Sequence, residues 1–593
     1  MSADFKTALI KDSRIAGITS QLTYAVMSGG SSCNYQSFPA ISPNSTSITF
    51  NVNVPSENTI VNREVLVKTK INFTMEITNV ASGSYALALG QNDAPAPFPL
   101  NQLFQTATAQ INNTSVSVNS QDVLPSILAM TSQEEVSKYN GMTPHLLDNY
   151  YFNFGDTTTT ANNNPLGNYQ LSNLDPAYTP RGVHPVKIMG INRLVLPSTN
   201  SKTLVSSGAT DVFTIGLQIE VCEPIFCLSP FLYGSPEFNS QGLVGVSNIN
   251  FTFNIDSAFK RFWSSANSGY TLNSIKGGIN VPTDTTNNTT SVFPNCEMLV
   301  NFISSQPEDR IEARNVVPYL DLPRYITSSS ETLTASASPT TTLTANNITL
   351  NQLPDYFIIS VRKRIQDMKY YEASGFLAIQ NIKINLNNVS GLLSSASRED
   401  LYRMSRKNGS HQSWEAFSGQ VQKFATASAT GASVALMPTI GSVLVLSPAM
   451  DLSLPSYLSN GSLGSYNLSF TIDVKNYTSA DITSSEIVVI ACNSGVMTTI
   501  AGSSSLYTGI LTKQMVIDAK AMGQLDPIQS SQYVRLVGGT MNEKMLSNVK
   551  EMPMTKEFDK NMYIKMKGFS GNGVMSGGGV SSGGRLSHIT TRR

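Results

Sequence analysis

The sequence contains one strand-rich pattern twice, and this repeat limits the possible folds more than any other feature. A Leu-Ser-Pro triplet begins at Leu228 and again at Leu446, 218 residues later. An alternating segment follows it at 248–255 and again at 467–474, 219 residues later. Every second residue of both segments is apolar, which is typical of a strand with one buried face. The repeat is too long for a solenoid unit and predicts two complete β-sandwiches in tandem; two strands that merely look alike are the alternative. The apolar residues are Ile249, Phe251, Phe253 and Ile255 in the first copy, and Leu468, Phe470, Ile472 and Val474 in the second.

Composition supports a β-rich structural protein. The 593 residues leave room for two domains of this size and two tails, and 40% of them are hydrophobic, enough for a sizeable core. Charged residues make up only 13%, about half the usual share, and the formal net charge is zero. The polar surface must therefore consist largely of Ser, Thr and Asn. Such a surface suits close packing of copies side by side, and no sequence-wide basic excess favours wrapping nucleic acid.

The cysteines and the N-terminal sequence predict folding in a reducing compartment. Five cysteines are scattered along the chain without a CxxC motif, which argues against a disulfide framework. The N-terminal residues lack the charged and then apolar pattern of a secretory signal, and no apolar run approaches the length of a membrane span. We therefore expect an intracellular protein with no membrane-spanning segment.

Changes in composition along the chain predict four regions. We expect an N-terminal arm at 1–40, a first sandwich at 41–285, a second sandwich at 286–505 and a C-terminal tail at 506–593. The end of the tail is rich in Gly and Ser and is expected to be flexible. Its last 53 residues carry nine Lys and Arg against four Asp and Glu. This basic segment is either a weak contact for nucleic acid or simply a solvated tail.

Short helices are expected within the loops. One is predicted around 124–139, with Pro125 tolerated near its start. A second is predicted after Ser397, because Ser397 and Asp400 have the spacing of a capping box. Long irregular stretches are expected at 148–184 and 327–347, and residues 512–522 are compatible with a helix. The helix thus precedes the irregular stretch in the first half and follows it in the second.

Several short motifs resemble one known protein family. The sequence resembles the major capsid proteins of virophages and polinton-like viruses over roughly residues 35–500. The matches are Phe38-Pro39, Asn62-Arg63, Phe98-Pro99-Leu100, Ile111-Asn112-Asn113, and Glu223-Pro224-Ile225 leading to Leu228-Ser229-Pro230.

The resemblance implies a fold, an assembly and a set of partners. The fold would be all-β, a tandem double jelly roll of two eight-stranded sandwiches with short helices in the loops and a flexible C-terminal tail, as in adenovirus hexon. Three copies would form a pseudo-hexameric capsomer of an icosahedral shell around double-stranded DNA. The chain would then lie in the virion and be assembled inside the infected host cell. Neighbouring capsomers, penton proteins, minor capsid proteins and a maturation protease would be its partners.

Two sites in the tail are similar to the hydrophobic-x-Gly-Gly sites that adenovirus-type maturation proteases cut. One is Leu536-Val537-Gly538-Gly539 and the other is Met575-Ser576-Gly577-Gly578. Paired glycines allow an extended backbone to enter a narrow cleft. The candidate cleavage residues are Gly539 and Gly578, with simple turns as the alternative. Cleavage after Gly539 would release the basic segment.

The sequence offers little catalytic chemistry. The four histidines are not spaced to bind a metal together, and no HExxH or phosphate-binding glycine motif is present. A GxSxG match at 579–583 lies in the low-complexity tail, without the strand and helix that a nucleophile elbow needs. Cys227 is better explained as a small buried residue than as a reactive thiol. We therefore expect no enzyme, no metal and no cofactor.

The two long irregular stretches are the expected contacts between subunits, because long loops often carry such roles. Tyr150, Tyr151, Phe152 and Tyr169 are the candidate intersubunit residues, with packing onto their own domain as the alternative. The competing function is a tandem β-sandwich adhesive or carbohydrate-binding surface protein. A jelly-roll enzyme would need clustered His and Glu residues that the sequence does not provide.

Overall fold

The computed structural model describes most of the chain between residues 31 and 509. The structural statements below concern this described part. The helix considered at 512–522 lies outside it. The described ranges are 8–9, 25–26, 31–79, 83–87, 93–137, 143–152, 185–192, 197–198, 201–206, 212–231, 242–265, 270–282, 284–305, 314–335, 340–387, 389–423, 435–454 and 460–509.

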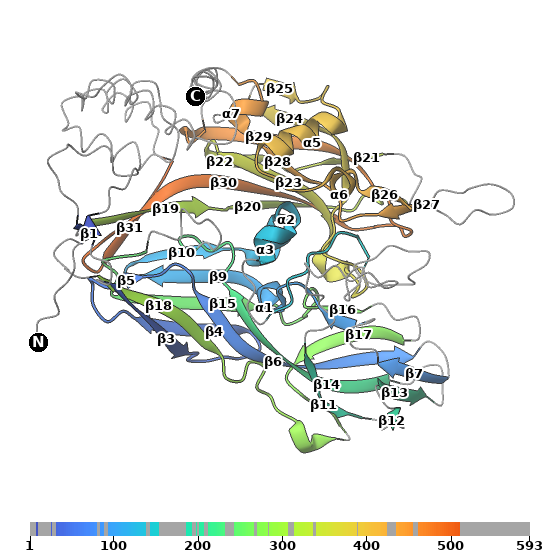
Figure 1. The fold of residues 1–593 in the computed structure, drawn as a ribbon. Coiled ribbons are helices and arrows are strands. Elements are labelled where there is room, and N and C mark those ends of the chain that lie inside the picture. The colour runs from blue at the N-terminus through green and yellow to red at the C-terminus, as the bar shows by residue number, and fades with distance from the viewer. Residues whose placement is uncertain are drawn as a thin grey trace, which may run out of the picture.

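Two β-sandwiches are stacked on one another, one from each half of the chain (Figure 1). In the first sandwich one sheet has the strand order β10-β9-β15-β4. The other has the order β3-β18-β6-β14, with β11 beside β14, β17 paired with β6 and β5 paired with β18. The bounds are β3 Ser31–Pro39, β4 Ser47–Asn53, β5 Ile60–Val61, β6 Leu66–Asn79, β9 Phe104–Ile111, β10 Thr114–Val118, β11 Val186–Ile191, β14 Val212–Pro224, β15 Asn248–Ile255, β17 Tyr270–Gly277 and β18 Glu297–Ser305.

The second sandwich repeats this plan with two of its strands divided. One sheet has the order β25-β24-β29, followed by β21 and β22, which both pair with β29. The other has the order β28-β23-β30, and β30 then pairs with β19, β20 and β31. The bounds are β19 Arg314–Asp321, β20 Arg324–Ser329, β21 Thr341–Thr344, β22 Ile348–Gln352, β23 Tyr356–Lys363, β24 Ala378–Leu386, β25 Val389–Leu392, β28 Val443–Leu446, β29 Leu463–Lys475, β30 Ser485–Ile500 and β31 Ser503–Thr508.

The strand orders confirm a tandem double jelly roll. Reading each half in chain order, β3, β4, β6, β9, β10, β14, β15 and β18 occupy the same sheet positions as β19/β20, β21/β22, β23, β24, β25, β28, β29 and β30. The repeated alternating segments are β15 and β29, and each lies at the centre of its sheet. The sequence repeat therefore corresponds to a repeated fold, here called jelly roll 1 and jelly roll 2.

The expected division at 285/286 falls before the last strand of jelly roll 1. β18 was expected to open the second half, but it pairs with β3 along its whole length and with β6 at its start. β3 in turn belongs to the first sandwich, although residues 1–40 were expected to be an arm. Alternation predicts that β3 and β18 are strands but does not show which sheet they join. The boundary between the two sandwiches lies between β18 and β19.

Short helices, 3₁₀ turns and small sheets fill the connections. Four small sheets of the described residues lie outside the main ones: β7-β13-β12, β8 paired with β16, β26 paired with β27, and β1 paired with β2. No helix of the described residues is long and apolar enough to cross a membrane. The bounds are β1 Ala8–Leu9, β2 Ala25–Val26, β7 Gly83–Leu87, β8 Asp93–Pro95, β12 Pro197–Ser198, β13 Ser201–Ser206, β16 Trp263–Ser265, β26 Gln420–Lys423, β27 Ala435–Pro438, α1 Pro99–Leu103, α2 Ser120–Met130, α3 Gln133–Ser137, α5 Arg398–Lys407, α6 Trp414–Ser418, α7 Pro448–Asp451, η3 Thr285–Asn287 and η5 Ile365–Asp367.

The two halves place their helices at the same point, contrary to the expected exchange of order. α2 follows the β9–β10 pair, and α5 follows the equivalent β24–β25 pair. Ser397 and Asp400 form the predicted capping box at the start of α5. The stretch 327–347 is not one loop, because β20 and β21 occupy both of its ends. The stretch was predicted to be irregular because it is rich in serine and threonine, although threonine is a good strand former.

The hydrophobic core of jelly roll 1 continues into jelly roll 2. One cluster of buried side chains fills the first sandwich and extends to Ile358, Val445 and Ile490 of the second. Alternate neighbours such as Ile359 and Val489 face the separate core of jelly roll 2. The sheet of β28, β23 and β30 is therefore buried on both faces, which explains its nearly unbroken apolar sequence.

Candidate assembly interface

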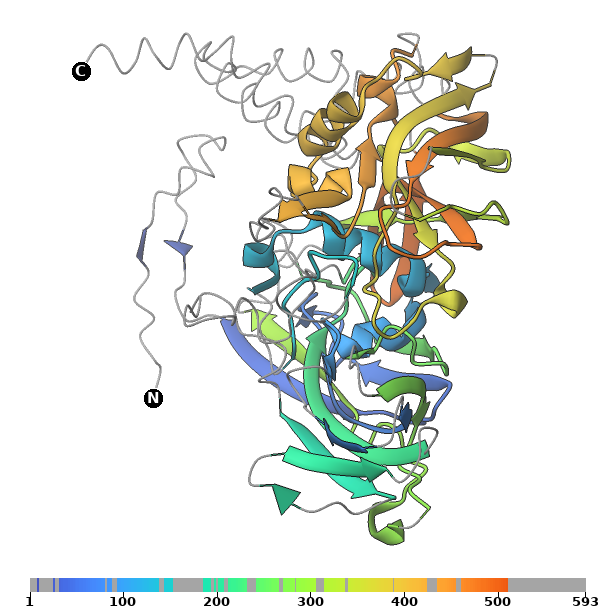
Figure 2. The ribbon, with the colours of Figure 1, turned by 90° about the vertical axis from the view of Figure 1, so that its right-hand side faces the viewer.

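Helix α2 lies between the two jelly rolls (Figures 1 and 2). It packs on α1 and β9 of jelly roll 1 and reaches β28 of jelly roll 2. Seven of its eleven residues are buried, including Pro125 in mid-helix. The backbone oxygen of Met130 at its C-terminal end accepts a hydrogen bond from His411 N in jelly roll 2 (2.8 Å). A helix that is apolar on nearly all sides belongs inside a protein, and here it joins two sandwiches.

Charged side chains cross the same junction. Asp122 of α2 is buried, and its Oδ1 lies 2.5 Å from Nη2 of Arg362 on β23, while its Oδ2 pairs with Arg324 on β20. Arg362 also lies 3.2 Å from Oε2 of Glu486 on β30. Removing one partner of a buried pair leaves the other charge without compensation, which costs roughly 3–5 kcal/mol. The cluster therefore fixes the relative position of the two jelly rolls.

Arg261 adds a further buried charge close to this cluster. Burial and, to a smaller extent, nearby Arg362 lower the pKa of its guanidinium to about 10, while Asp122 and Asp256 oppose the change. The group is still protonated at neutral pH. Its three nitrogens make no hydrogen bond within the described part of the chain. The junction thus holds its positive charges largely through the two carboxylates of Asp122 and Glu486.

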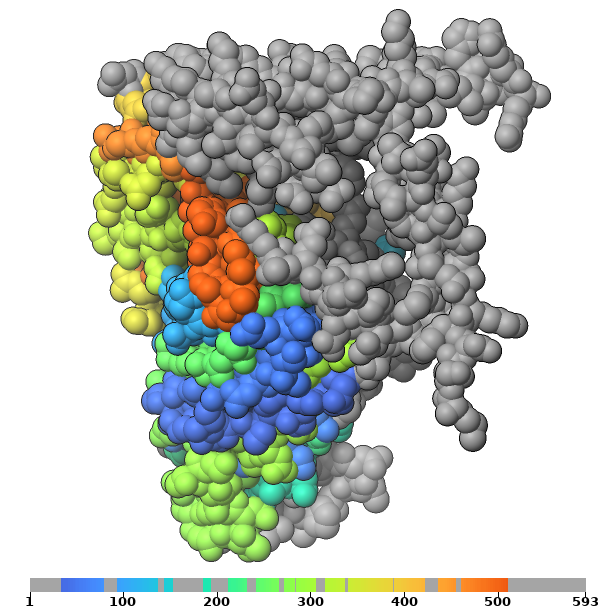
Figure 3. All heavy atoms as spheres, turned by 90° about the vertical axis from the view of Figure 1, so that its left-hand side faces the viewer, coloured from blue at the N-terminus to red at the C-terminus, as the bar shows by residue number. Residues whose placement is uncertain are grey.

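A second contact is made by the hairpin of β30 and β31, which extends from jelly roll 2 onto the loops of jelly roll 1 (Figure 3). Ser504 donates its Oγ to Ile111 O (2.6 Å), and its backbone nitrogen donates to Asn113 Oδ1 (2.8 Å). The turn at Gly502 donates to Gly245 O (3.0 Å). Gly245 has φ +74°, and a Cβ there would lie 3.1 Å from the backbone nitrogen of Ala501, so the close approach favours glycine.

Residues 150–152 form the third contact, within the chain. Tyr150 bridges to Thr439 and Phe152 to Glu372, both in jelly roll 2. Tyr151 donates its backbone N–H to Pro438 O (3.2 Å), and its side chain is buried against jelly roll 2. Tyr151 therefore serves its own chain and is corrected from a candidate intersubunit residue to an intrachain one. Tyr150 and Phe152 are partly exposed, and Tyr169 lies outside the described residues.

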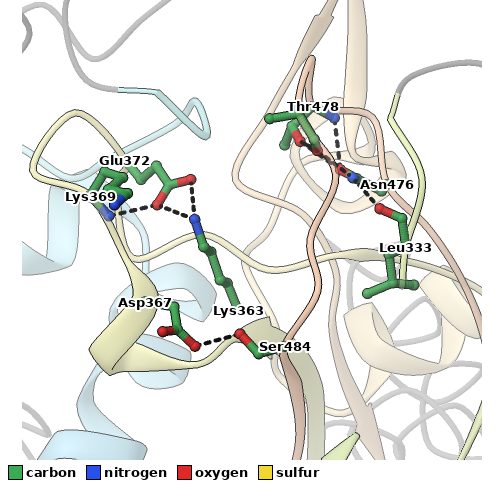
Figure 4. A network of polar contacts seen from close by, with 9 residues as sticks. Leu333, Lys363, Asp367, Lys369, Glu372, Asn476, Thr478 and Ser484 are labelled. Carbon is green, nitrogen blue, oxygen red and sulfur yellow. Dashed lines mark hydrogen bonds and ion pairs between the residues drawn. The ribbon is translucent and has the colours of Figure 1, made fainter. Parts of the chain in front are cut away.

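Polar contacts fix the loops of jelly roll 2 beside this segment (Figure 4). Lys363 Nζ lies 3.0 Å from both carboxylate oxygens of Glu372, and the backbone nitrogen of Lys369 donates to the same carboxylate (2.7 Å). Ser484 donates to Asp367 across the base of the loop. The backbone of Glu372 that receives Phe152 is thus held in place by its own side chain.

Two motifs of the family resemblance meet inside jelly roll 1. Glu223 is fully buried, and its carboxylate accepts from the backbone nitrogens of Leu100 and Asn101 at the start of α1 (both 2.9 Å) and from Thr143 Oγ1 (2.8 Å). Burial raises the pKa of Glu223, and these hydrogen bonds oppose the rise. The triplet that begins at Leu228 is buried and contacts jelly roll 2, since Ser229 Oγ accepts from Leu320 N of β19 (2.9 Å).

The described residues contain no group of three or more His, Cys, Asp or Glu side chains that could hold a metal ion. Burial lowers the pKa of His145 and raises that of the Cys227 thiol to about 12. Both are core residues of jelly roll 1. The candidate cleavage residues Gly539 and Gly578 lie outside the described part of the chain.

Sequence reasoning missed the contacts that join the jelly rolls. Asp122, Arg362 and Ser504 carried no motif, and Asp122 and Arg362 are separated by 240 positions in the chain. One signal was present: an aspartate on a helix with apolar residues on nearly all sides must find a buried partner.

Comparisons with known proteins agree with this architecture. The family model for the Sputnik virophage major capsid protein 1st domain matches residues 3–303, and the model for the major capsid protein V20 C-terminal domain matches residues 322–495. The V20 capsid protein of Sputnik virophage is 25% identical over 515 residues, which cover 85% of this chain and 80% of that protein. The two matched ranges are separated by residues 304–321, which include the end of β18 and all of β19.

Solved structures show the same fold. The cryo-EM structure of the Sputnik virophage matches with a TM-score of 0.68 and 22% identity, covering 87% of this chain and 95% of the other. The crystal structure of the mavirus major capsid protein matches with a TM-score of 0.61 and 14% identity, covering 87% and 98%.

Proposed function

Because this chain belongs to the Sputnik virophage major capsid protein family and is a structural protein of the virion shell, we propose that three copies assemble into a pseudo-hexameric capsomer. The family membership does not favour an adhesive surface protein or an enzyme. The observation that carries the proposal is the identical strand order of the two jelly rolls. One chain contributes two similar units, so a threefold ring of chains presents six such units to its neighbours.

The intrachain junction supports this assembly by making each chain one rigid part. The α2 contact, the β30–β31 hairpin and residues 150–152 hold the two jelly rolls at three separate places. A ring of six units closes only if the angle within each chain and the angle between chains are both fixed. Capsomers then tile an icosahedral shell through many modest contacts that symmetry multiplies.

The test is the mass and outline of the purified full-length protein, by light scattering and negative-stain imaging. We expect particles of three times the 64.0 kDa chain mass with a hexagonal outline. A folded monomer over a wide range of concentration and salt would overturn the proposal. Circular dichroism of the same sample establishes that the chain is folded.

The tail beyond the described residues is proposed to be removed during maturation, with Gly539 as the main cut and Gly578 as a second. The support is the match of both sites to the hydrophobic-x-Gly-Gly pattern. Intact mass spectrometry of the protein from mature particles tests this, and a full-length mass there would contradict it. The basic tail is further proposed to touch genomic DNA weakly, and penton and minor capsid proteins are proposed to complete the shell. Tyr150, Phe152 and Tyr169 are kept as proposed contacts between subunits.

A further inference from the structure

Helices α2 and α5 occupy equivalent places in the two jelly rolls and can be compared residue by residue. Each follows the same strand pair, and each has an aspartate as its third residue, Asp122 in α2 and Asp400 in α5. The fourth residues, Val123 and Leu401, are both fully buried in their own sandwiches. The two helices therefore present equivalent faces to their own jelly rolls.

Beyond that shared face, only α2 is covered. Its sixth and ninth residues, Pro125 and Leu128, are buried, whereas the corresponding Arg403 and Arg406 of α5 are exposed. The extra burial of α2 comes from the sheet of jelly roll 2 that it touches. No described segment of the chain covers the same side of α5.

The sheet that receives α2 also has an equivalent in jelly roll 1. On β30, Glu486 lies opposite Arg362 of β23, and the two side chains form an ion pair. On β18, Glu297 lies opposite Lys68 of β6, and the two side chains lie 3.9 Å apart.

The outward face beside the Glu297–Lys68 pair is partly exposed to solvent, whereas the equivalent face beside the Glu486–Arg362 pair is buried. Val488, which follows Glu486 on the same face of β30, is buried beneath jelly roll 1. Its counterpart Leu299 on β18 is only partly buried, and the side chains of Lys68 and Glu297 are 39% and 35% exposed. This face of β6 and β18 thus has the features of a docking surface for a helix like α2.

We propose that α5 of one copy packs against the outward face of β6 and β18 of the next copy, with Asp400 beside Lys68 as Asp122 lies beside Arg362. This contact rests on the proposed pseudo-hexameric trimer, since the step from jelly roll 2 to the next jelly roll 1 must then repeat the step within the chain. Three such head-to-tail contacts close a ring.

The two contacts differ in polarity because one forms during folding of the chain and the other forms between chains that are already folded. The contact of α2 forms while the chain folds and can bury apolar side chains permanently. α5 must stay soluble until a second folded copy arrives, so its exposed face carries Glu399, Arg403, Arg406 and Lys407. A charged interface guides docking and weakens as salt screens it.

Charge reversal in the full-length protein tests the pairing. Asp400→Lys and Lys68→Glu are each expected to raise the protein concentration needed for half-assembly about tenfold, because each trimer repeats the contact three times. The double variant is expected to recover most of the assembly. Asp400→Asn keeps an acceptor for the helix cap and separates loss of the cap from loss of charge, and Lys276→Glu, an exposed lysine elsewhere on β17, is the matched control. Additive losses in the double variant would overturn the pairing.

Disulfide trapping gives a second, independent readout. Asp400→Cys and Lys68→Cys are combined with Cys222→Ser, because Cys222 lies opposite Lys68 on β14 and is partly exposed. Mild oxidation is expected to give covalent two-chain and three-chain species that neither single cysteine variant gives. Trimers by light scattering without these species would overturn the contact while leaving the trimer intact. A monomeric wild-type chain would instead overturn the proposed function.

Discussion

The two jelly rolls share one strand order but differ in what covers their equivalent outer sheets. In jelly roll 2, Val443, Val488 and Ile490 face outward and are buried beneath jelly roll 1. In jelly roll 1, the corresponding face carries Lys68 and Leu299, which are partly exposed. One fold thus supplies a permanent apolar junction on one side and a polar surface on the other. The difference teaches that duplication fixes the geometry, while side chains decide which contact forms during folding.

The largest expected effect comes from breaking the charge cluster at the permanent junction. Asp122→Ala removes one of the two carboxylates that compensate buried Arg362 and also the partner of partly exposed Arg324, and we expect the free energy of unfolding to fall by about 4 kcal/mol. Urea unfolding followed by circular dichroism measures it. Asp400→Ala, at the same position of α5, is the control and removes only a helix cap and exposed charge. Equal losses in the two variants would contradict the comparison.

Two buried carboxyls allow the halves to be compared by pH. Burial raises the pKa of Asp93 in jelly roll 1 to about 7 and that of Asp355 in jelly roll 2 to about 6. Because both values are raised, the stability that each neutral carboxyl contributes is complete below about pH 4 and is lost as the pH rises through the raised pKa.

Asp93→Asn should therefore gain stability relative to wild type as the pH rises from 4 to 8, by at most about 4 kcal/mol for a shift of roughly three pKa units. Asp355→Asn should show the same sign with its midpoint about one pH unit lower and a smaller amplitude. Thermal unfolding across this pH range measures both differences. A flat difference for Asp93→Asn would show that its carboxyl is already ionised in the folded protein.

Truncating one residue on each outer sheet tests the difference in burial directly. Ile490→Ala removes apolar volume that is fully buried at the junction and should cost about 3 kcal/mol. Leu299→Ala, at the counterpart of Val488 and two residues before that of Ile490, should cost clearly less in the monomer because its side chain is partly exposed. Denaturant unfolding of both variants under conditions that keep the chain monomeric gives the comparison. An equal or larger loss for Leu299→Ala would mean that the face of jelly roll 1 is no less buried than that of jelly roll 2.

The sequence allowed the fold to be predicted but not the junction. Alternation at β15 and β29 is a local pattern with a fixed spacing, so it survives in the sequence and marks the repeat. The sequence did not show that β18 belongs to jelly roll 1, because its pairing with β3 and β6 produces no pattern in the local sequence. The pairing of Asp122 with Arg362 depends on how two sandwiches stack, and no spacing along the chain encodes it. Tyr151 is an aromatic residue of the kind that interfaces favour, but its side chain is buried against jelly roll 2 of its own chain.

The smallest expected effect concerns how the two equivalent helices begin. Ser397 accepts from Asp400 N and completes a capping box, whereas Asn119 before α2 makes no side-chain cap. α5, partly exposed, depends on its cap, while α2 is held by burial on both sides. Ser397→Ala should therefore cost about 1 kcal/mol in urea unfolding, and Asn119→Ala should cost a few tenths at most. A cap effect of equal size at both helices would show that packing does not replace capping in α2. The start of the helix would then no longer distinguish α2, buried at the junction within the chain, from α5, which is proposed to dock on a second copy.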